Sequence, residues 1–472
     1  MRPWLLMALS FAPFVQAQDA KGRAAALAQA RRDLQAQLEV ADMLLERGDV
    51  DAAELAYRKA MERFAAALGG AAEAAPKPVP KLEPEDPALR AEEVKRNPPV
   101  WARRRIGTDG KKGALRAGGG SGLTESAVAL GLDWLAKHQD EDGRWDCDGF
   151  TKHDPANDLC DGAGDPQFDV GVTGLALLAF LGAGYTDDGG PYADNVRKGL
   201  DFLIANRAEN GWIASADPSL AIYEHAIAAT VLSEAYGMTR SPRARDAAQR
   251  AVNVLQRARN PHLGWRYASN GENDTSVTAW CTQALHVAST TGLTVDPEAL
   301  KGARVWVETV TEPNFGQVGY VTKGGPPARL ERNAKRFPAE KSQSMTAAGI
   351  FIRIVAGEDP MASEPIRRGG SLCSDSYGLP KWNPEDGSID MYYWYWGTLA
   401  LFQVGGTHWR KWNEAMVEAV VKHQHLTGNG SRSGSWDPID PWGPDGGRVY
   451  STAMLTMCCE VYYRYDRVFG VK

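Results

Sequence analysis

The 472-residue sequence has no broad basic field and no long segment in which apolar and polar residues alternate. It holds 53 Lys and Arg against 59 Asp and Glu, a formal net charge of −6, so nucleic acid and anionic membranes are poor candidates as partners. The missing alternation excludes a large β-sheet. The Asp-Asp-x-x-Asp pattern of diphosphate and Mg²⁺ binding is also absent. What remains is the composition of an ordinary, mildly acidic soluble protein that is rich in Gly and Trp.

The first 17 residues are predicted to be a signal peptide. Arg2 supplies a positive start, residues 5–15 form a short apolar core, and Val15-Gln16-Ala17 is a small-residue cleavage site. The apolar run is too short to span a bilayer, and no cysteine follows the cleavage site as a lipid anchor would require. The sequence therefore predicts a periplasmic or secreted protein. The alternative is that these residues form a buried N-terminal helix.

Two further segments precede the main domain. Residues 18–70 are Ala-rich and charged, with a break near Gly48, and resemble a single tetratricopeptide-like helical hairpin. Such hairpins need about three copies to form a stable array, so this one is predicted to be either a docking arm or a solvated spacer. Residues 71–120 contain several prolines and end in Gly118-Gly119-Gly120, which predicts a flexible linker.

Helical patterns recur in pairs along the rest of the chain. Within residues 126–145, Val128, Leu132 and Leu135 recur at three- and four-residue steps, which predicts a helix with one apolar face. Residues 170–181 are apolar nearly all round and predict a buried partner helix. Similar pairs follow, each about 50–65 residues long with its loop. The second helices of these later pairs are predicted over residues 223–235, 275–287, 345–355, 391–404 and 451–463.

The first pair resembles the QW motif of squalene–hopene cyclases, at Gly131, Trp134, Leu135, Gln139, Gly143 and Trp145. The sixth pair keeps Gln424, Gly434 and Trp436, whereas the second has Arg207 at the Gln position. The chain also resembles the secreted squalene-cyclase-repeat proteins of planctomycete-type bacteria, a family of unassigned activity. The resemblance implies an all-α fold, an (α/α)6 toroid of the terpenoid cyclase and prenyltransferase type, over residues 121–472.

The catalytic motif of squalene–hopene cyclases, Asp-x-Asp-Asp-Thr, is not intact. Its nearest match is Gly271-Glu272-Asn273-Asp274-Thr275, in which Asn273 replaces the acid that protonates the alkene. An amide cannot deliver that proton. The Zn²⁺ ligands of protein prenyltransferases and the Gly-Cys-x-Glu-Gln thioester motif have no match either, so the resemblance predicts no cofactor.

Acidic residues recur near the starts of the predicted inner helices. The register is taken from Thr173, Ala228, Thr278, Thr346 and Thr452, and the residues four positions earlier are Asp169, Glu224, Asp274, Ser342 and Arg448. His225 adjoins Glu224, and Asp390 begins the fifth inner helix. We predict that Asp274, Asp169 and Glu224 are catalytic candidates and that His225, Asp390 and Arg448 bind a ligand. The alternative is helix capping, which Asp at a helix start serves well.

Two other features suggest chemistry. Five aromatic residues run from Tyr392 to Trp396, and Tyr392, Tyr395 and Trp396 would share one helical face, either as a ligand-binding wall or as helix packing. The loop after the first helix contains Cys147, His153 and Cys160 among five aspartates. In an exported protein a Cys147–Cys160 disulfide is the favoured prediction. A metal site on these cysteines with His153, and a Ca²⁺-binding acidic loop, are the alternatives.

The leading hypothesis is an exported toroid that binds a small molecule or a protein partner at the mouth formed by its inner helices. One alternative is a terpenoid cyclase-like enzyme with Asp274 or Asp169 as its acid. A second is a glycan-active enzyme in which Asp169, Glu224 and Asp274 supply carboxylates. A third is a structural scaffold that the N-terminal hairpin tethers to a larger assembly.

Overall fold

The computed structural model divides the chain into two compact units, residues 1–90 and 91–472. It describes residues 59, 101, 104, 109–215, 221–261, 263–267, 272–426 and 428–467. The predicted signal peptide lies outside the described residues, and so does the predicted tetratricopeptide-like hairpin apart from one residue. The fold described below is that of the second unit.

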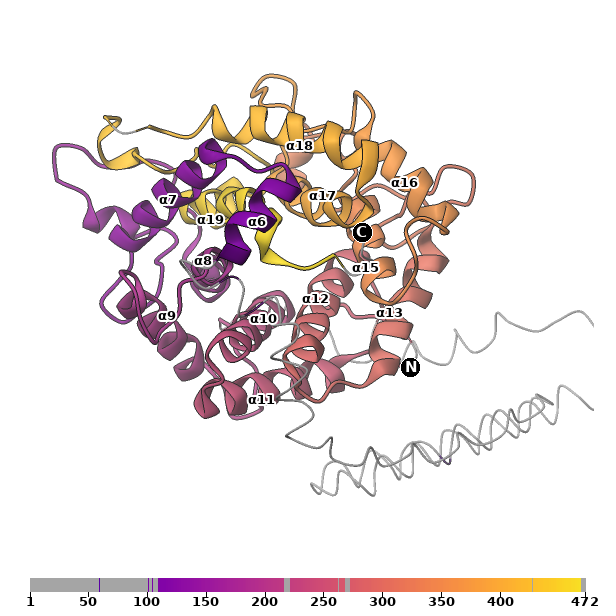
Figure 1. Cartoon of the computed structure of the whole chain (residues 1–472), viewed down its shortest axis with the longest axis horizontal. Coiled ribbons are helices and arrows are strands. Elements are labelled where there is room, and N and C mark those ends of the chain that lie inside the picture. The colour runs from indigo at the N-terminus through magenta and orange to yellow at the C-terminus, as the bar shows by residue number, and fades with distance from the viewer. Residues whose placement is uncertain are drawn as a thin grey trace, which may run out of the picture. The chain divides into compact units, whose positions relative to one another are not determined.

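Six helix pairs follow one another along this unit, each with an outer and an inner helix (Figure 1). The outer helices are α7 (Gly122–Lys137), α9 (Ala193–Ala205), α11 (Pro242–Ala258), α13 (Pro297–Val310), α16 (Glu364–Ser374) and α18 (Gly406–Val421). The inner helices are α8 (Asp169–Ala183), α10 (Ala221–Thr239), α12 (Thr275–Thr291), α15 (Ser344–Val355), α17 (Met391–Val404) and α19 (Gly443–Arg464).

The loops that join the helices are irregular. They carry short helices at η1 (Phe150–His153), η2 (Pro166–Phe168), α14 (Glu331–Ala334), η3 (Ala339–Lys341) and η4 (Gly430–Arg432). The part of the chain that the structure describes has isolated bridges but no β-strand. The predicted all-α class is therefore confirmed.

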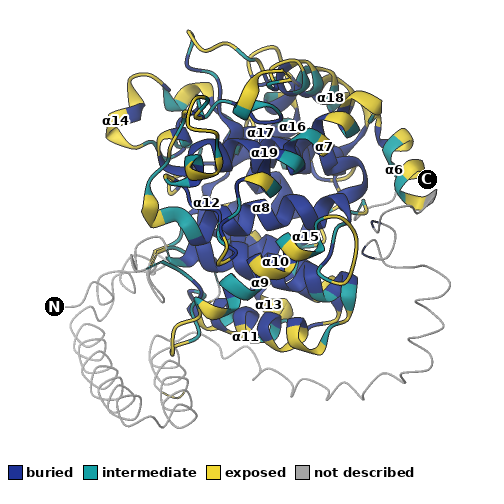
Figure 2. Ribbon diagram, turned by 90° about the vertical axis from the view of Figure 1, so that its left-hand side faces the viewer, coloured by how far each residue is buried: buried dark blue, intermediate teal, exposed yellow. Residues whose placement is uncertain are grey.

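The inner helices form a closed ring. Each of them contacts the next along the chain, and the last, α19, contacts the first, α8. Hydropathy explains which helix of a pair lies inside: α8 is buried at every position from Val170 to Ala183, whereas α11 buries an Ala and Val stripe and exposes Arg243 and Arg245. Figure 2 shows this buried interior with the exposed residues around it. The fold is the predicted (α/α)6 toroid.

One helix in this ring is apolar over a long stretch. Residues Pro166–Ala183, which include α8, would be long and apolar enough to cross a membrane, but 78% of them are buried within the ring. Each fully buried Leu of such a helix contributes about 1.5–3 kcal/mol to stability.

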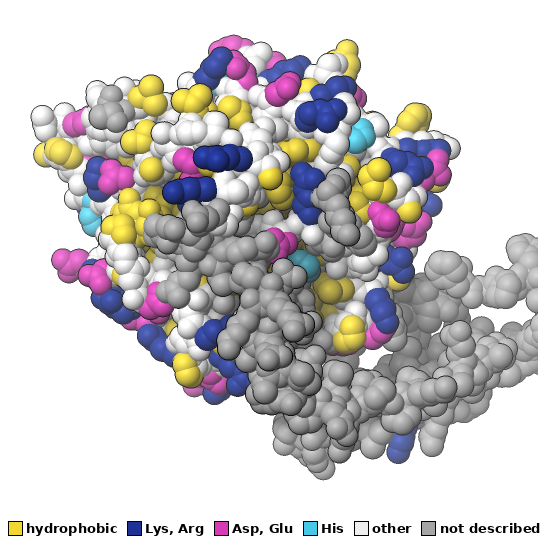
Figure 3. Space-filling model, viewed as in Figure 1, with side chains coloured by type: hydrophobic (Ala, Val, Ile, Leu, Met, Phe, Trp, Pro, Cys, Tyr) yellow, Lys and Arg dark blue, Asp and Glu magenta, His cyan; other side chains and the backbone are white. Residues whose placement is uncertain are grey.

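The surface carries charges of both signs. On the face that Figure 3 shows, Lys and Arg side chains lie among Asp and Glu side chains.

The last part of the predicted linker is ordered. Residues Asp109–Gly118 form helix α6, which contacts α19, and Trp101 and Arg104 are buried in the same unit. Trp409 Nε1 donates to the carbonyl of Gly118 at 2.8 Å, and Asn413 Nδ2 donates to that of Gly119 at 3.1 Å. The prediction of a flexible linker up to residue 120 is corrected here, because the Gly-rich backbone gains fixed partners from α18.

A tryptophan closes the outer helix in three of the repeats. The indole Nε1 of Trp145, Trp265 and Trp436 donates to a carbonyl near the end of the preceding outer helix, at 2.7, 2.8 and 2.8 Å respectively. All three indoles are fully buried. These carbonyls belong to the last turns of the outer helices, where carbonyl groups lack the full set of intrahelical donors. The tryptophan of these repeats thus ties the end of the outer helix to the loop that follows it.

The threonines near the starts of the inner helices also hold the loops in place. The backbone N–H of Trp145 donates to Thr173 Oγ1 at 2.9 Å, and that of Trp265 donates to Thr278 Oγ1 at 3.1 Å. The fourth and sixth repeats use Thr346 and Thr452 in the same way. The inner helices of these four repeats therefore each hold the preceding loop through one hydroxyl group.

The glutamine of the repeat joins one hairpin to the next. Gln139 Nε2 donates to the carbonyls of Gly143 and Asn195, the latter in α9. Gln424 Nε2 donates to the carbonyls of Gly434 and Ala127, at 2.8 and 2.9 Å, and Ala127 lies in α7. The last copy of this contact therefore connects the sixth hairpin to the first.

We expect Trp436→Phe to lower the free energy of unfolding by about 1–2 kcal/mol, because the ring stays buried but the hydrogen bond to Val420 is lost. Trp306→Phe is the matched control, since Trp306 Nε1 has no hydrogen-bond partner among the described residues. Urea denaturation of the two variants and the wild type measures the difference. Equal losses in both variants would contradict the proposed role of the indole N–H.

Candidate functional site

The candidate site lies where the inner helices begin. An outer helix returns the chain between successive inner helices, so the inner helices run in one direction and their N-terminal ends meet at one face of the ring. Two tyrosines from first turns and two from the preceding loops lie near one another and near Asp274 at this face: Tyr223, Tyr392, Tyr267 and Tyr320. We call these four tyrosines, with Asp274 and Ser276, the tyrosine basin.

Hydroxyl groups in the tyrosine basin are hydrogen bonded to one another. Tyr223 Oη donates to Ser276 Oγ at 2.9 Å, and Ser276 Oγ lies 2.7 Å from Tyr392 Oη. Tyr267 Oη lies 2.6 Å from Tyr320 Oη. Hydroxyl groups both donate and accept, so this network can rearrange around a polar ligand. Tyr267 is 38% exposed, and Tyr223 and Tyr392 are half-buried, so the network is reachable from one side.

Asp274 lies beneath these hydroxyl groups. Its Oδ1 caps α12 by accepting from the backbone N–H of Val277 at 2.7 Å. Its Oδ2 is buried and accepts no hydrogen bond from any residue that the structure describes. The nearest cation is Arg266, whose Nε lies 3.7 Å away and is likewise buried without a hydrogen-bond partner. Burial raises the pKa of Asp274 to about 7, although the Val277 N–H, the Arg266 charge and the Tyr320 hydroxyl oppose the shift.

A second buried carboxyl group lies nearby. Asp440 Oδ2 accepts from the backbone N–H of Met391 at 3.0 Å and from Tyr450 Oη at 3.2 Å. Its Oδ1 accepts from the backbone N–H of Trp442 at 3.2 Å. Burial and the neighbouring Asp390 carboxylate raise the pKa of Asp440 to about 7. Unlike Asp274, both of its oxygens have partners.

Asp390 lies at the start of α17, as predicted, and both of its carboxylate oxygens have partners within the fold. Its Oδ1 caps α17 by accepting from the backbone N–H of Tyr393, and its Oδ2 lies 2.6 Å from Arg329 Nη2. The Arg329 guanidinium is 5.9 Å from the ring of Trp442, which in turn lies 6.1 Å from the ring of Tyr392. Trp442 and Arg329 therefore extend the polar and aromatic surface beyond the tyrosine basin.

Two residues predicted to act at the mouth serve the fold instead. Glu224 is 3% exposed, and its carboxylate accepts from the backbone N–H groups of Gly171 and Ser215 and from Ser215 Oγ. His225 is fully buried: its Nδ1 accepts from the backbone N–H of Ile213, and its Nε2 faces the carbonyl of Ala251. It thus replaces the loop-holding threonine in the second repeat. Burial lowers the pKa of His225 to about 4.

Asp169 and Arg448 are also held by neighbours. Asp169 Oδ1 accepts from the backbone N–H of Cys147 at 2.9 Å, and its Oδ2 pairs with Arg144 at 3.1 Å. Arg448, 1% exposed, pairs with the carboxylates of Asp161 and Asp437. Both residues therefore fix loops to the ring, and the partial acidic ring with one Arg that the sequence predicts at the mouth is reduced to Asp274 and its neighbours.

The aromatic cluster lies mostly in the interior. The rings of Tyr392, Tyr395 and Trp396 lie 6.4, 5.5 and 5.1 Å from the ring of Trp280, so the three do share a face. Tyr395 and Trp396 are buried, and Tyr395 Oη accepts from Gln283 Nε2 at 2.6 Å. Only Tyr392 reaches the tyrosine basin. The other two pack the axis rather than line a ligand-binding wall.

The predicted disulfide is absent. Cys147 and Cys160 are both free and buried. Cys147 Sγ donates to the carbonyl of Asp445 at 3.2 Å, whereas Cys160 Sγ lies 3.7 Å from a carboxylate oxygen of Asp154. Each thiol has its own polar partner on a different side of the loop, which the sequence spacing alone could not indicate. His153 pairs with Asp140 at 2.7 Å.

Several residues of the site lie outside the sequence predictions, namely Ser276, Tyr223, Tyr267, Tyr320, Arg266, Arg329, Asp440 and Trp442. Tyr320 follows Gly319 in the loop of the fourth repeat, and this Gly-aromatic pair is part of the repeat pattern rather than a sign of a site. Asp440 lies in a loop rich in Pro and Trp that has no periodic pattern. Loops of this kind carry function without a local signature.

Comparison with known proteins gives structural similarities only. No family model matches the sequence, and no curated protein matches it. The chain is similar to an inactive variant of the α-1,6-mannanase GH76A of Salegentibacter sp. HEL1_6 in complex with α-1,6-mannotriose. The identity is 10%, over 72% of this chain and 99% of that chain, with a TM-score of 0.49.

Two other solved structures have comparable identities and TM-scores. The cellobiose 2-epimerase from Spirochaeta thermophila DSM 6192 has 13% identity over 72% of this chain and 95% of that chain, with a TM-score of 0.49. An α-amylase from Clostridium perfringens has 14% identity over 71% and 97%, with a TM-score of 0.45. At these identities and scores, nothing about the activity of this chain follows from them.

We expect Asp274→Asn to change how stability depends on pH. The folded carboxyl holds its proton up to about pH 7, whereas the unfolded one releases it near the ordinary aspartate pKa of 3.8. The wild type should therefore lose stability relative to the variant as pH rises from about 4 to about 7, by about 2–4 kcal/mol in total. Asn keeps the helix cap. Urea denaturation of both proteins at several pH values measures this difference, and parallel curves would contradict the assignment.

Proposed function

We propose that the protein binds a glycan at the tyrosine basin and that Asp274 exchanges a proton with it. The observation that carries this proposal is the pair of buried, oppositely charged atoms without hydrogen-bond partners among the described residues, Asp274 Oδ2 and Arg266 Nε. Buried polar groups in folded proteins are nearly always hydrogen bonded. A carboxylate oxygen and a guanidinium N–H that face each other at 3.7 Å without a hydrogen bond, beneath a partly exposed set of hydroxyl groups, favour a bound polar ligand.

The chemistry of the tyrosine basin favours a ligand with many hydroxyl groups. The hydroxyls of Tyr223, Ser276 and Tyr392 form one hydrogen-bonded chain, and those of Tyr267 and Tyr320 form another. Both chains can exchange partners with sugar hydroxyls without leaving a buried group unsatisfied. The exposed Tyr267 ring offers the combination of an apolar face and a polar edge that a sugar ring needs.

Asp274 has properties suited to general acid–base catalysis. A carboxyl group with a pKa of about 7 is populated in both protonation states near neutral pH, which is the condition under which proton transfer is most effective. Asp440 shares this pKa, but its oxygens are occupied by Met391, Tyr450 and Trp442, so we assign it a positioning role. Glycoside hydrolysis requires two carboxyl groups across the scissile bond, and Asp440 and Asp390 both have hydrogen-bond partners on each oxygen, so Asp274 is the carboxyl group that we assign to proton transfer.

The resemblance to squalene–hopene cyclases supports a terpenoid substrate as the second candidate. Two observations oppose it. Protonation of an alkene requires a strong acid, whereas burial raises the pKa of Asp274. A linear terpenoid requires a large apolar cavity, whereas the described part of the ring axis is packed by Trp280, Tyr395 and Trp396. We therefore place the glycan ahead of the terpenoid.

We also propose that residues 1–17 direct export to the periplasm or the exterior, which would bring the tyrosine basin to extracellular glycans. The composition of this segment is the support for the proposal. The hairpin of residues 18–70 would then act as a tether to a larger assembly.

The test is turnover and binding of a panel of soluble polysaccharides and oligosaccharides. We expect Asp274→Asn to lower turnover of the accepted glycan by about 10²–10⁴-fold, the range of one general acid or base, while the dissociation constant changes little. Release of reducing ends measures turnover, and isothermal titration calorimetry measures binding. Asp296→Asn is the matched control, because Asp296 caps an outer helix and lies on no inner-helix start.

Tyr267→Ala should instead weaken glycan binding by about 10-fold, because a stacking platform contributes about 0.5–1.5 kcal/mol beyond its buried area. Unchanged binding in this variant would contradict the placement of the ligand. Wild-type protein that binds no member of the panel would favour the scaffold hypothesis, and cyclised products from squalene would favour the terpenoid candidate.

A further inference from the structure

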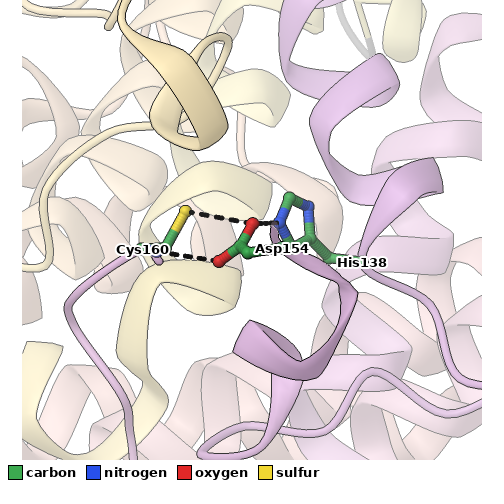
Figure 4. A group of neighbouring side chains, drawn as sticks. All are labelled: His138, Asp154 and Cys160. Atoms are coloured by element: carbon green, nitrogen blue, oxygen red, sulfur yellow. Dashed lines mark hydrogen bonds and ion pairs between the residues drawn. The ribbon is translucent and has the colours of Figure 1, made fainter. Parts of the chain in front are cut away.

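Three potential metal ligands of different chemistry meet in the loop between α7 and α8 (Figure 4). His138 is the residue that ends α7, Asp154 follows η1, and Cys160 lies further along the loop. Their ligand atoms lie within 4.8 Å of one another. The side chains of His138 and Asp154 are 4% and 2% exposed, and Cys160 is 7% exposed. The cluster is thus shielded from solvent and separate from the tyrosine basin.

The two nitrogens of His138 each face an oxygen. Nδ1 lies 2.7 Å from the backbone carbonyl of Trp134, and Nε2 lies 2.9 Å from Asp154 Oδ1. A carbonyl can only accept, so Nδ1 carries a proton. Nε2 then points a lone pair at a carboxylate unless the ring is a cation. The imidazole ring is buried and stacks on the indole of Trp134, with centroids 4.0 Å apart, so its orientation is fixed.

We infer that His138, Asp154 and Cys160 form a binding site for Zn²⁺, with Nε2, Oδ1 and Sγ as the ligands. Nitrogen, carboxylate oxygen and thiolate sulfur are the donors that Zn²⁺ takes, and a tetrahedral ion places its ligands about 3–4 Å apart. Oδ1 already lies 2.9 Å from Nε2 and 3.7 Å from Sγ, so small shifts complete the geometry. A water molecule takes the fourth position. Binding releases the thiol proton of Cys160 to solvent.

The surrounding contacts are those that orient metal ligands. The hydrogen bond from Nδ1 to Trp134 fixes the tautomer that leaves Nε2 free to bind. Asp154 Oδ2 accepts from the backbone N–H of Cys160 at 2.8 Å, which aims Oδ1 toward the other two ligands. Phe150 packs against the rings of Trp134 and His138, at 5.5 and 5.8 Å, and closes the apolar side of the site.

The position of the cluster gives the ion a structural role. Next to Cys160, Asp161 pairs with Arg432 and Arg448, both in the sixth hairpin. Asp158 in the same loop accepts from the backbone N–H of Ser431 at 2.7 Å. An ion held here fixes the loop by which the first hairpin meets the last, and this role does not depend on the proposed glycan.

Titration of the metal-free full-length protein with Co²⁺ tests the inference, because a cobalt–thiolate bond gives a charge-transfer absorption that nitrogen and oxygen ligands do not give. We expect one equivalent of Co²⁺ with this absorption, displaced by Zn²⁺. Cys160→Ser should abolish the absorption, and His138→Gln should weaken binding by about 100-fold or more. His153→Gln and Cys147→Ser alter a second histidine and a second thiol of the same loop. Both variants should leave the cobalt absorption and the metal affinity unchanged.

Absence of Co²⁺ and Zn²⁺ binding by the wild type would overturn the inference without recourse to any variant. Binding that survives in Cys160→Ser, or that is lost in Cys147→Ser, would overturn the choice of ligands. Circular dichroism of each variant shows whether a loss of binding reflects a loss of fold. If Cys160→Ser does not fold, Cys160→Ala together with the wild-type stoichiometry and absorption decides the question.

Discussion

Contact between the last hairpin and the first closes the ring, and the rest of the structure depends on this closure. Helix α19 packs against both α7 and α8. The side-chain hydrogen bonds that cross the seam join residues 297, 297 and 286 positions apart: Gln424 to Ala127, Trp134 to Ser431, and Arg464 to Leu178. The entropy lost in closing a loop grows only slowly with its length, so a few buried contacts with the packing of α19 suffice. Closure is also what brings the starts of the inner helices to one face.

Buried carboxyl groups at the two ends of the ring differ in their hydrogen-bond partners. At the ends of the inner helices, the Glu234 carboxylate is fully buried and accepts from Arg104, Arg464 and Tyr465. Such a network is stable as a set, because removal of one member would leave an uncompensated buried charge. At the starts of the inner helices, Asp274 keeps one oxygen without a hydrogen bond from a described residue. Both oxygens of the Glu234 carboxylate have partners, whereas the buried Oδ2 of Asp274 lies beneath partly exposed hydroxyl groups that a ligand can reach.

The loops from outer to inner helices carry the chemistry, and the repeat contacts are what allow this. In four repeats the Thr hydroxyl of the inner helix fixes the preceding loop at one point, and in three of these a tryptophan also ties the loop to the outer helix. The other residues of each loop can then differ from one repeat to the next. The loop before α12 accordingly presents Tyr267 to the mouth, whereas the loop before α8 brings together the His138 cluster. The second repeat keeps the same constraint with His225 in place of threonine.

The sequence by itself determined the fold class, the number of helix pairs, which helix of each pair is buried, and the position of Asp274 at the start of an inner helix. These follow from side-chain periodicity and from turn residues, which act over a few positions of the chain. Only the tertiary structure decided that Glu224 and His225 serve packing, that Asp440 is a buried acid, and that Cys160 faces Asp154 rather than Cys147. It also decided that α6 is part of the ring. The physical reason is that these outcomes depend on hydrogen-bond partners and burial supplied by neighbouring hairpins and loops, often far away in the chain, and no local pattern records such contacts.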